Sequence, residues 1–420
     1  MMTRILPTMM MALALLLPLA NPLAAQIALP QVQVPEVPGT LDGIAGRLDP
    51  TLDELDMRLQ REARRLIRLR ERATDRLLRQ HRNLIERDAR GELARRGELL
   101  VQGAGAEVLE ILRHAGFPVL STESIEGLDM TVTRIGIPAG LDLATAQSLA
   151  IELAPGADIS ADNLHYHSGT STPTAAAALP MALQSAAATV RTEVGMIDGA
   201  PGPSIGVSSQ KGFAKGAPFA SNHGSAIASL LKSAGVARVR VADVYGTDPA
   251  GGNALAIARG LGWLTASGSK VVTISLVGPR NSVVANAIAA ARRKGVVVVA
   301  AVGNDGPAAP PAYPASYEGV VAITGVDGRN RALIEAGRAL HLDYAAPGAD
   351  VYALDAKGKR SRWRGTSFAT PLAAARIAAA MDGQADWRSA VDNEARDLGA
   401  KGTDAVYGRG LLCGKCARAN

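Results

Sequence analysis

The sequence predicts an α/β protein whose main domain has three layers, with helices on both faces of a mostly parallel sheet. After residue 189, short runs of β-branched residues alternate with helical stretches, and strands buried on both faces of a parallel sheet have this composition. The expected strands are Glu193–Asp198, Val236–Val244, Val271–Leu276, Val296–Val302 and Val320–Val326. We expect this domain to cover residues 189–413, followed by a tail over residues 414–420.

A smaller α+β domain is expected over residues 98–168, before the main domain. Its elements follow in the order strand, helix, strand, strand, helix, strand, which is the ferredoxin-like pattern. Their ranges are Leu99–Val101, Ala106–His114, Pro118–Leu120, Met130–Ile135, Leu143–Leu153 and Ile159–Tyr166. The stretch 169–188 is then the linker between the two domains.

An arginine-rich segment covers residues 51–96, with fourteen Arg, no Lys and nine acidic residues. Its Leu and Ala residues recur mostly at intervals of three and four, which predicts an amphipathic helix or a helical hairpin. A solvated outer face explains the arginines most simply, and binding to a membrane surface or an acidic partner is the alternative. The segment lacks interleaved aromatic residues and any nucleic-acid motif, so we expect no nucleic-acid partner.

The amino terminus has the pattern of a secretory signal peptide. A basic start, Met1–Arg4, precedes the apolar run Ile5–Ala20, and small residues before Gln26 suggest a cleavage point. We therefore expect a signal peptide over residues 1–25, with an uncleaved membrane anchor as the alternative. A proline-rich linker follows over residues 26–50. An exported protein, periplasmic or secreted, is the expected outcome.

The most informative motif is Gly365-Thr366-Ser367-Phe368-Ala369-Thr370-Pro371. The residues after it are almost all apolar, so the helix that they form should be buried on every side. A serine at the start of such a helix can act as a nucleophile beside the positive end of the helix dipole. The simpler alternative is a capped core helix, because Ser and Thr are favoured at helix starts.

Three other segments supply groups that could act with Ser367. Asp198 ends an apolar strand, and a buried carboxylate needs a hydrogen-bond donor. His223 begins an apolar helix-like run, and Asn304 follows a strand at the edge where open α/β sheets bind ligands. Taken singly, each also fits an ordinary turn or cap.

Together these segments resemble the subtilase family of serine endopeptidases over about residues 190–412. The resemblance implies a triad of Asp198, His223 and Ser367, in the chain order of subtilisin, with Asn304 as an oxyanion donor. It also implies a set of substrate-binding residues: Ser275, Leu276, Val277, Gly278 and Gly303. Val277 replaces a glycine that is usual in the family, and we expect it to favour small side chains before the cleaved bond.

The same resemblance gives residues 98–168 a role. A domain of this pattern before a subtilase domain is similar to the family's inhibitory propeptide, whose last strand and tail lie across the active site. Self-cleavage would then fall in the linker 169–188, at a bond that the sequence does not identify. An unrelated small domain is the alternative. The implied partners are protein or peptide substrates and the chain's own propeptide.

The chain has two cysteines, Cys413 and Cys416, which are candidates for a short-loop disulfide in an exported protein. His165 and His167 have the spacing of a metal half-site, but no acidic or cysteine ligand adjoins them, and plain extended chain is the preferred interpretation. We therefore expect no metal site and no required cofactor, with calcium suggested only by the family resemblance.

The preferred function is that of an exported serine endopeptidase that processes its own propeptide. One alternative is a catalytically silent binding protein on the same fold. The other is an enzyme tethered to a membrane or partner by residues 51–96.

Overall fold

The computed structural model describes residues 45–167, 189–383 and 386–414, with only the backbone for part of the first helix. The chain divides into two units, Met1–Asp53 and Glu54–Asn420, and the second contains both predicted domains. The predicted signal peptide, the linker 169–188 and Cys416 lie outside the described residues, as does most of the proline-rich linker 26–50. In the part of the chain that is described, no helix is long and apolar enough to cross a membrane.

The main domain is built on a seven-stranded sheet in the order β14-β13-β12-β10-β7-β9-β8, and all of its strand pairs are parallel. The strands are β7 (Val194–Asp198), β8 (Ser209–Gly212), β9 (Val239–Asp243), β10 (Val271–Ile274), β12 (Val297–Ala301), β13 (Val321–Val326) and β14 (Tyr344–Pro347). The five expected strands are all present. The edge strands β8 and β14 were not predicted, because neither contains a run of β-branched residues.

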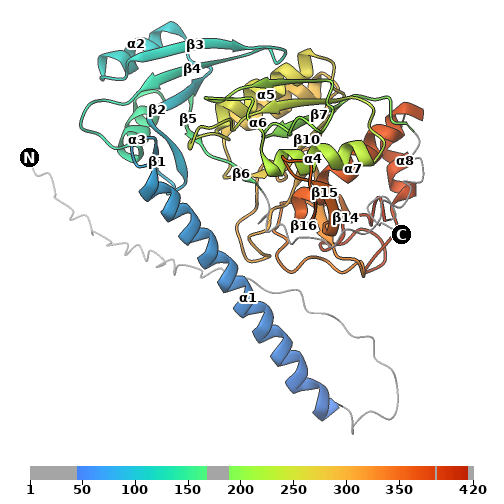
Figure 1. The fold of residues 1–420 in the computed structure, drawn as a ribbon. Helices are drawn as coiled ribbons and strands as arrows, with labels where there is room; N and C mark the ends of the chain where they lie inside the picture. The colour runs from blue at the N-terminus through green and yellow to red at the C-terminus, as the bar shows by residue number, and fades with distance from the viewer. Residues whose placement is uncertain (1–44, 168–188, 384–385, 415–420) are drawn as a thin grey trace, which may run out of the picture. The chain divides into compact units, whose positions relative to one another are not determined.

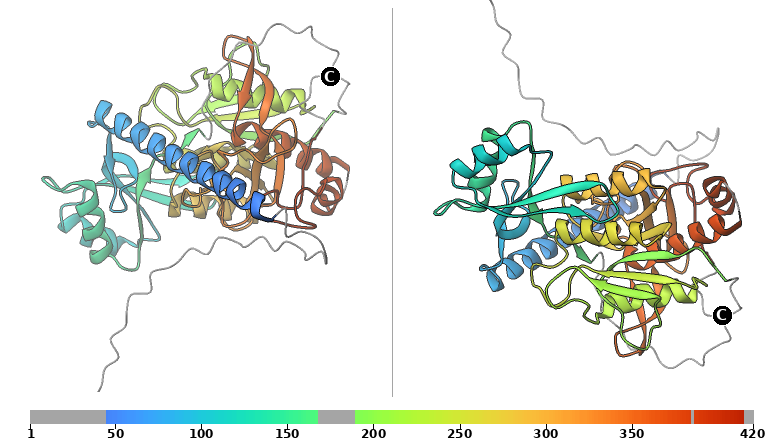
Figure 2. Two further views of the ribbon diagram at one scale, coloured as in Figure 1. Left: turned by 90° about the horizontal axis from the view of Figure 1, so that it is seen from below. Right: turned by 90° about the horizontal axis from the view of Figure 1, so that it is seen from above.

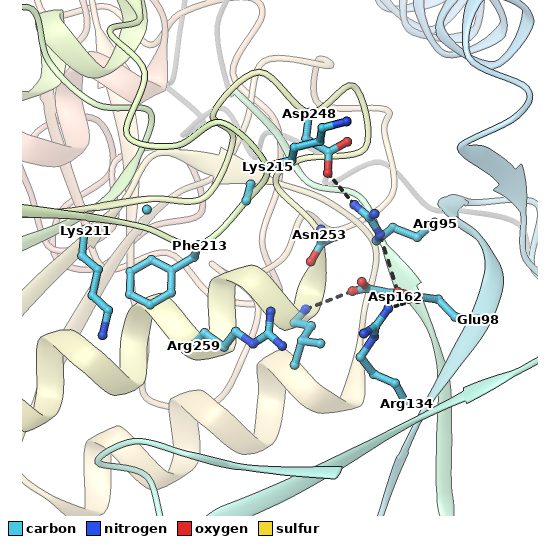
Figure 3. A pocket seen from close by; sticks show the side chains of 13 residues that line it. Arg95, Glu98, Arg134, Asp162, Lys211, Phe213, Lys215, Asp248, Asn253 and Arg259 are labelled. Carbon is cyan, nitrogen blue, oxygen red and sulfur yellow. Dashed lines mark hydrogen bonds and ion pairs between the residues drawn. The ribbon is translucent and has the colours of Figure 1, made fainter. Parts of the chain in front are cut away.

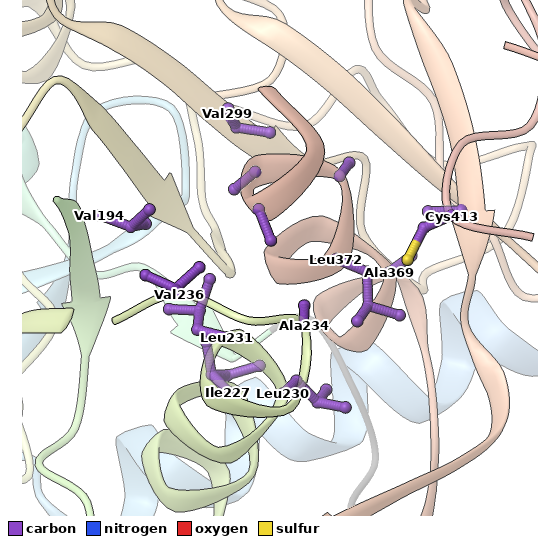
Figure 4. Packing of buried hydrophobic residues seen from close by; sticks show 14 of the residues in the cluster. Val194, Ile227, Leu230, Leu231, Ala234, Val236, Val299, Ala369, Leu372 and Cys413 are labelled. Atoms are coloured by element: carbon purple, nitrogen blue, oxygen red, sulfur yellow. The ribbon is translucent and has the colours of Figure 1, made fainter. Parts of the chain in front are cut away.

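Helices cover both faces of this sheet, so the predicted three-layer α/β fold is confirmed (Figure 1). The helices are α4 (Asn222–Ser233), α5 (Ala254–Ala266), α6 (Ser282–Arg293) and α7 (Thr366–Gly383). Alternate side chains of a strand point to opposite faces. Val194 therefore lies in the same buried cluster as Leu231 of α4 and Leu372 of α7 (Figure 4). Ile197 packs on the other side, in the cluster that contains Leu261 of α5.

The C-terminal part of the main domain adds a hairpin and a last helix. These elements are β15 (Ala349–Leu354), β16 (Arg360–Arg364) and α8 (Trp387–Glu394). Cys413 is disulfide-bonded and is 5% exposed in the cluster that contains Leu372 (Figure 4). The sequence holds only one other cysteine, Cys416.

The smaller domain has all six expected elements in the expected order. They are β2 (Leu93–Gln102), α2 (Ala106–His114), β3 (Val119–Ile125), β4 (Met130–Gly136), α3 (Leu143–Leu153) and β5 (Asp158–Asn163). The strands pair in the order β5-β2-β4-β3, all antiparallel, which is the ferredoxin-like arrangement. One face of this sheet packs on α2 and α3, and the other faces α5 and α6 of the main domain (Figure 2).

The arginine-rich segment is helical over a shorter range than predicted. A single helix, α1 (Ala45–Gln80), is followed by β1 (Ile85–Arg87), which pairs with β2. The prediction of helix or helical hairpin up to residue 96 is therefore wrong in its last third. Ile85 and Leu93 are buried on either side of the β1–β2 turn, where Gly91 has a φ of +79°. The spacing of apolar residues by three and four, on which the prediction depended, does not distinguish this turn from a helix.

Many arginines of this segment have partners within the chain, which favours a structural role for them over tethering. Arg95 lies 2.7 Å from Asp248 of the main domain, and Arg70 lies 3.3 Å from Asp305. Further ion pairs join Arg87 to Asp75, Arg90 to Asp88 and Arg96 to Glu86.

Candidate active site

Ser367 is the second residue of α7 and is fully buried. Four residues later, Pro371 lacks the backbone N–H that would bond to the Ser367 carbonyl in a regular helix. Ser275, directly after β10, fills this gap: its hydroxyl donates to the Ser367 carbonyl at 3.0 Å. In return, Ser367 Oγ donates to the Ser275 carbonyl at 3.2 Å. The helix start is therefore fixed to the carboxyl end of the sheet.

Asp198 and His223 are hydrogen-bonded to each other. His223 Nδ1 lies 2.9 and 3.0 Å from the two carboxylate oxygens of Asp198, which also accepts the Gly199 N–H at 2.8 Å. Burial by itself raises the pKa of Asp198, but the imidazoles of His223 and His167 and these hydrogen bonds outweigh it, so the pKa lies below its usual value. The carboxylate is therefore ionised and holds the proton of His223 on Nδ1.

The approach of α4 to the end of β7 depends on Gly224. A Cβ at this position would lie 1.9 Å from the Gly199 carbonyl oxygen, closer than any two such atoms can come. Ser221 caps the same helix and accepts the Gly224 N–H at 2.9 Å. These two residues place His223 over the carboxylate.

Asn304 lies three residues after β12, next to the start of α7. Its side-chain oxygen accepts the Thr366 N–H at 3.0 Å, while the Thr366 hydroxyl donates to the Gly303 carbonyl at 3.1 Å. Since the amide oxygen is held by the helix, the amide nitrogen is the donor that Asn304 can present to a bound carbonyl.

A short strand, β6 (Tyr166–His167), follows the smaller domain and pairs antiparallel with β11 (Leu276–Val277) of the main domain. The His167 ring stacks on His223, with centroids 4.2 Å apart and planes 5° apart. His165 lies against Gly278. This segment therefore runs along the predicted substrate-binding residues, beside the His223–Asp198 pair.

Ser367 and His223 are not hydrogen-bonded to each other. Within the described residues, His223 Nε2 is buried and has no hydrogen-bond partner, and Ser367 Oγ points its proton at Ser275. A rotation of the Ser367 side chain is needed for proton transfer, and such contacts commonly tighten only when substrate binds.

Comparison with known proteins identifies the family. A model of the subtilase family matches residues 208–410. Thermitase from Thermoactinomyces vulgaris is 33% identical over 193 residues, which cover 45% of this chain and 67% of thermitase. Subtilisin Savinase from Lederbergia lenta is 31% identical over 233 residues, which cover 51% of this chain and 85% of that protein. The chain belongs to the subtilase family.

As a subtilase, the protein is a serine endopeptidase, and solved structures share its fold. Fervidolysin from Fervidobacterium pennivorans, a keratinolytic enzyme, is 17% identical with a TM-score of 0.62, covering 78% of this chain and 61% of that one. The epidermin leader peptide processing protease from Staphylococcus aureus is 15% identical with a TM-score of 0.57, covering 77% of this chain and 97% of that one.

The substrate-binding residues predicted for this subtilase lie together in space. Leu276 and Val277 pair with β6, Gly278 adjoins His165, and Ser275 bonds to Ser367. The methyl groups of Val277 face Gly303: a Cβ on Gly303 would lie 3.3 Å from Val277 Cγ1. The preference for small side chains before the cleaved bond stays a prediction, with Val277 as the residue that would impose it.

Two functional candidates in this subtilase were missed by sequence reasoning. His165 and His167 were interpreted as plain extended chain, which describes their backbone but not their contacts with the main domain. The missed signal is that the two histidines alternate along the extended segment directly before the expected processing linker.

His167 also belongs to the one group of described side chains that lie close enough together to share a metal ion. Ligand atoms of His167, Asp198 and His223 lie within 4.8 Å of one another. An ion there would displace the proton between His223 and Asp198. The hydrogen bond between His223 and Asp198 accounts for the closeness of their ligand atoms.

Charged residues join the smaller domain to the main domain around a cavity of about 440 Å³ (Figure 3). Arg95 bonds to Asp248, and Arg134 pairs with Glu98. Asp162 accepts the Leu255 N–H at 2.9 Å in the first turn of α5, where negative charge is favoured. Burial raises the pKa of Asp162 to about 7.

A second helix start in the subtilase domain is also bonded to β5. Asn281 caps α6, and its amide nitrogen donates to the Ala161 carbonyl at 2.9 Å and to Asn163 at 3.0 Å. The strand β5 therefore contacts the first turns of both α5 and α6.

Proposed function

We propose that this serine endopeptidase cuts peptide bonds with Ser367 as nucleophile, His223 as base and Asp198 as the group that orients the base. The observation that carries the proposal is the bond of His223 Nδ1 to both oxygens of Asp198, at 2.9 and 3.0 Å. This geometry is the argument for Asp198 in particular, because the family match begins at residue 208, after it.

The chemistry follows from the position of one proton. With Nδ1–H held by Asp198, His223 Nε2 carries a lone pair and can accept the Ser367 proton as Oγ bonds to the scissile carbonyl carbon. The resulting imidazolium is stabilised by the carboxylate and returns the proton to the leaving amine. Water then attacks the acyl-enzyme by the same route in reverse and regenerates Ser367.

We further propose that the segment ending at His167 is an inhibitory propeptide, removed by self-cleavage in the linker 169–188. Pairing of β6 with β11 and the stacking of His167 on His223 support this role, because both occupy surfaces that a substrate needs. The bonds of β5 to the starts of α5 and α6 hold the domain in place. The signal-like residues 1–25 extend the proposal to an exported enzyme, periplasmic or secreted.

A fluorophosphonate label tests the proposed nucleophile. Only a serine activated by a positioned base reacts quickly with such a reagent, so we expect one label on the protein, at Ser367. The variant Ser367→Ala should take up none. Ser282→Ala is the matched control, since the Ser282 hydroxyl has no hydrogen-bond partner among the described residues, and it should label normally. A catalytically silent binding protein would leave all three unlabelled.

The role of Asn304 predicts a separate loss. Removing an oxyanion donor lowers kcat by about 10²–10³, as measured in subtilisin, a member of this family. We expect this loss in Asn304→Ala and also in Asn304→Asp, because the aspartate keeps an acceptor for the Thr366 N–H but offers no donor. Steady-state kinetics and thermal unfolding would be measured on both variants. A kcat close to wild type in Asn304→Asp would exclude the role.

A further inference from the structure

The strand β6 and the residues before it present two histidines to the main domain and one tyrosine away from it. Side chains of an extended segment alternate, so His165 and His167 share one face. Tyr166 packs on the opposite side, in the cluster that holds Leu77 and Leu78 of α1. The rings of His165 and His167 therefore lie on the main domain, whereas Ala250 is the one main-domain residue in the cluster around Tyr166.

His165 occupies a fully buried site on the main domain. Its backbone N–H donates to the Gly252 carbonyl at 2.8 Å, and its carbonyl accepts the Tyr245 hydroxyl at 2.9 Å. The ring lies so close to Gly278 that a Cβ there would be 2.5 Å from His165 Cδ2. The ring therefore packs directly against the Gly278 backbone, and only the absence of a side chain at Gly278 leaves room for it.

The site around His165 suits an uncharged ring. Nδ1 lies 3.3 Å from the carbonyl of Asn163 in the same segment, and Nε2 has no partner among the described residues. A charged imidazolium would bury a second N–H without an acceptor. Desolvation accordingly lowers the pKa of His165 to about 4.

His167 lies between two rings of the main domain. It stacks on His223 at 4.2 Å and meets Tyr245 edge-on at 4.3 Å. Its Nε2 is 3.6 Å from Asp198 Oδ1 and the side chain is 29% exposed. Desolvation and the neighbouring His223 lower the pKa of His167, outweighing Asp198.

We propose that this enzyme selects substrates with a neutral histidine, or another flat uncharged side chain, at two alternate positions just before the cleaved bond. The sites are those that His165 and His167 now fill: Gly278 lies against the ring in the first, and His223 and Tyr245 contact the ring in the second. A neutral ring stacked on His223 also favours the imidazolium formed during catalysis, whereas a charged ring repels it. The intervening side chain is not selected.

This inference rests on the proposed function, and the test separates the two. The full-length chain is produced, its active fraction is counted with the fluorophosphonate label, and its activity on casein is recorded. The substrate is the peptide of residues 161–174, Ala-Asp-Asn-Leu-His-Tyr-His-Ser-Gly-Thr-Ser-Thr-Pro-Thr. Variant peptides carry single changes, and kcat/KM is measured by mass spectrometry at pH 8.

We expect His165→Ala and His167→Ala each to lower kcat/KM by about tenfold or more, since truncating a buried ring commonly costs this much. His167→Lys should lower it further, because it places a cation on His223. Tyr166→Ala is the matched control and should stay within about threefold. Equal rates for all peptides, or no cleavage of the parent by labelled, casein-active enzyme, would overturn the selectivity alone.

The pH profile supplies a readout that general loss of binding does not give. Free histidine has a pKa of about 6.5, and docking lowers it, so the binding contribution is complete above this value and declines below it. Relative to a peptide with Phe at both positions, the parent should lose about tenfold per histidine by pH 5.5. Dividing kcat/KM of the parent peptide by that of the Phe peptide removes the effect of the enzyme's own titrating groups. A quotient that does not change with pH would contradict the proposal. Absence of labelling and of casein activity would overturn the proposed function itself.

Discussion

Ser367→Ala is expected to produce a folded, full-length chain that cuts neither its own linker nor an added protein. Removal of the nucleophile in subtilisin lowers kcat by about 10⁶-fold, and the same scale applies here by family membership. Folding should survive, because the lost hydroxyl makes a bond to the Ser275 carbonyl, while the reverse bond from Ser275 to the Ser367 backbone remains.

Amino-terminal sequencing of wild type and Ser367→Ala, made in a protease-deficient host, is the measurement. Wild type should begin within or after the linker 169–188, and the variant should begin well before residue 98. Circular dichroism serves as the check on folding. A variant that reaches the same amino terminus as wild type at the same rate would rule out self-processing by Ser367.

Asp198→Asn is expected to leave the site assembled but to reduce kcat by about 10⁴-fold at neutral pH. The asparagine can donate to His223 Nδ1, which moves the imidazole proton to Nε2 and removes the lone pair that accepts the Ser367 proton. In the wild type, the pKa of Asp198 lies below its usual value, so its charge is lost only in stronger acid than that of a free carboxyl.

Asp243→Asn is the matched control for this prediction. Asp243 ends the neighbouring strand β9, is paired in register with Asp198 and is equally buried. Its carboxylate accepts backbone N–H groups of Phe219, Tyr245 and Gly246 and has no contact with His223. We expect this variant to lose stability but to keep kcat. A similar kcat for the two variants would show that Asp198 has no special role.

The comparison of these two aspartates shows what the sequence could and could not decide. Both follow a β-branched strand, and only the motif resemblance singled out Asp198. The strands and helices of both domains were predictable because each depends on local apolar periodicity. By contrast, the turn from α1 into β1 was missed, since Ile85 and Leu93 become buried only by contact with distant residues.

The contacts of His165 and His167 could not be predicted for a related reason. Their partners, Gly278, Tyr245 and His223, are more than fifty residues away in the chain, and no local pattern identifies them. Stacking and desolvation are properties of the assembled protein. The sequence therefore predicted the candidate catalytic residues. Only the three-dimensional structure shows that β6 and the two histidines lie against them.

Pro371 has a consequence that reaches beyond its own helix. By omitting one N–H, it leaves the Ser367 carbonyl to Ser275, and Ser275 is directly followed by the strand that pairs with β6. A single peptide unit thus separates β11, which pairs with a bound chain, from Ser275, which holds the start of the helix that carries Ser367. A substrate that fits badly and displaces β11 sideways must therefore also displace Ser275 and, through its hydrogen bond, Ser367. Substrate binding and the reactivity of Ser367 are in this way mechanically coupled.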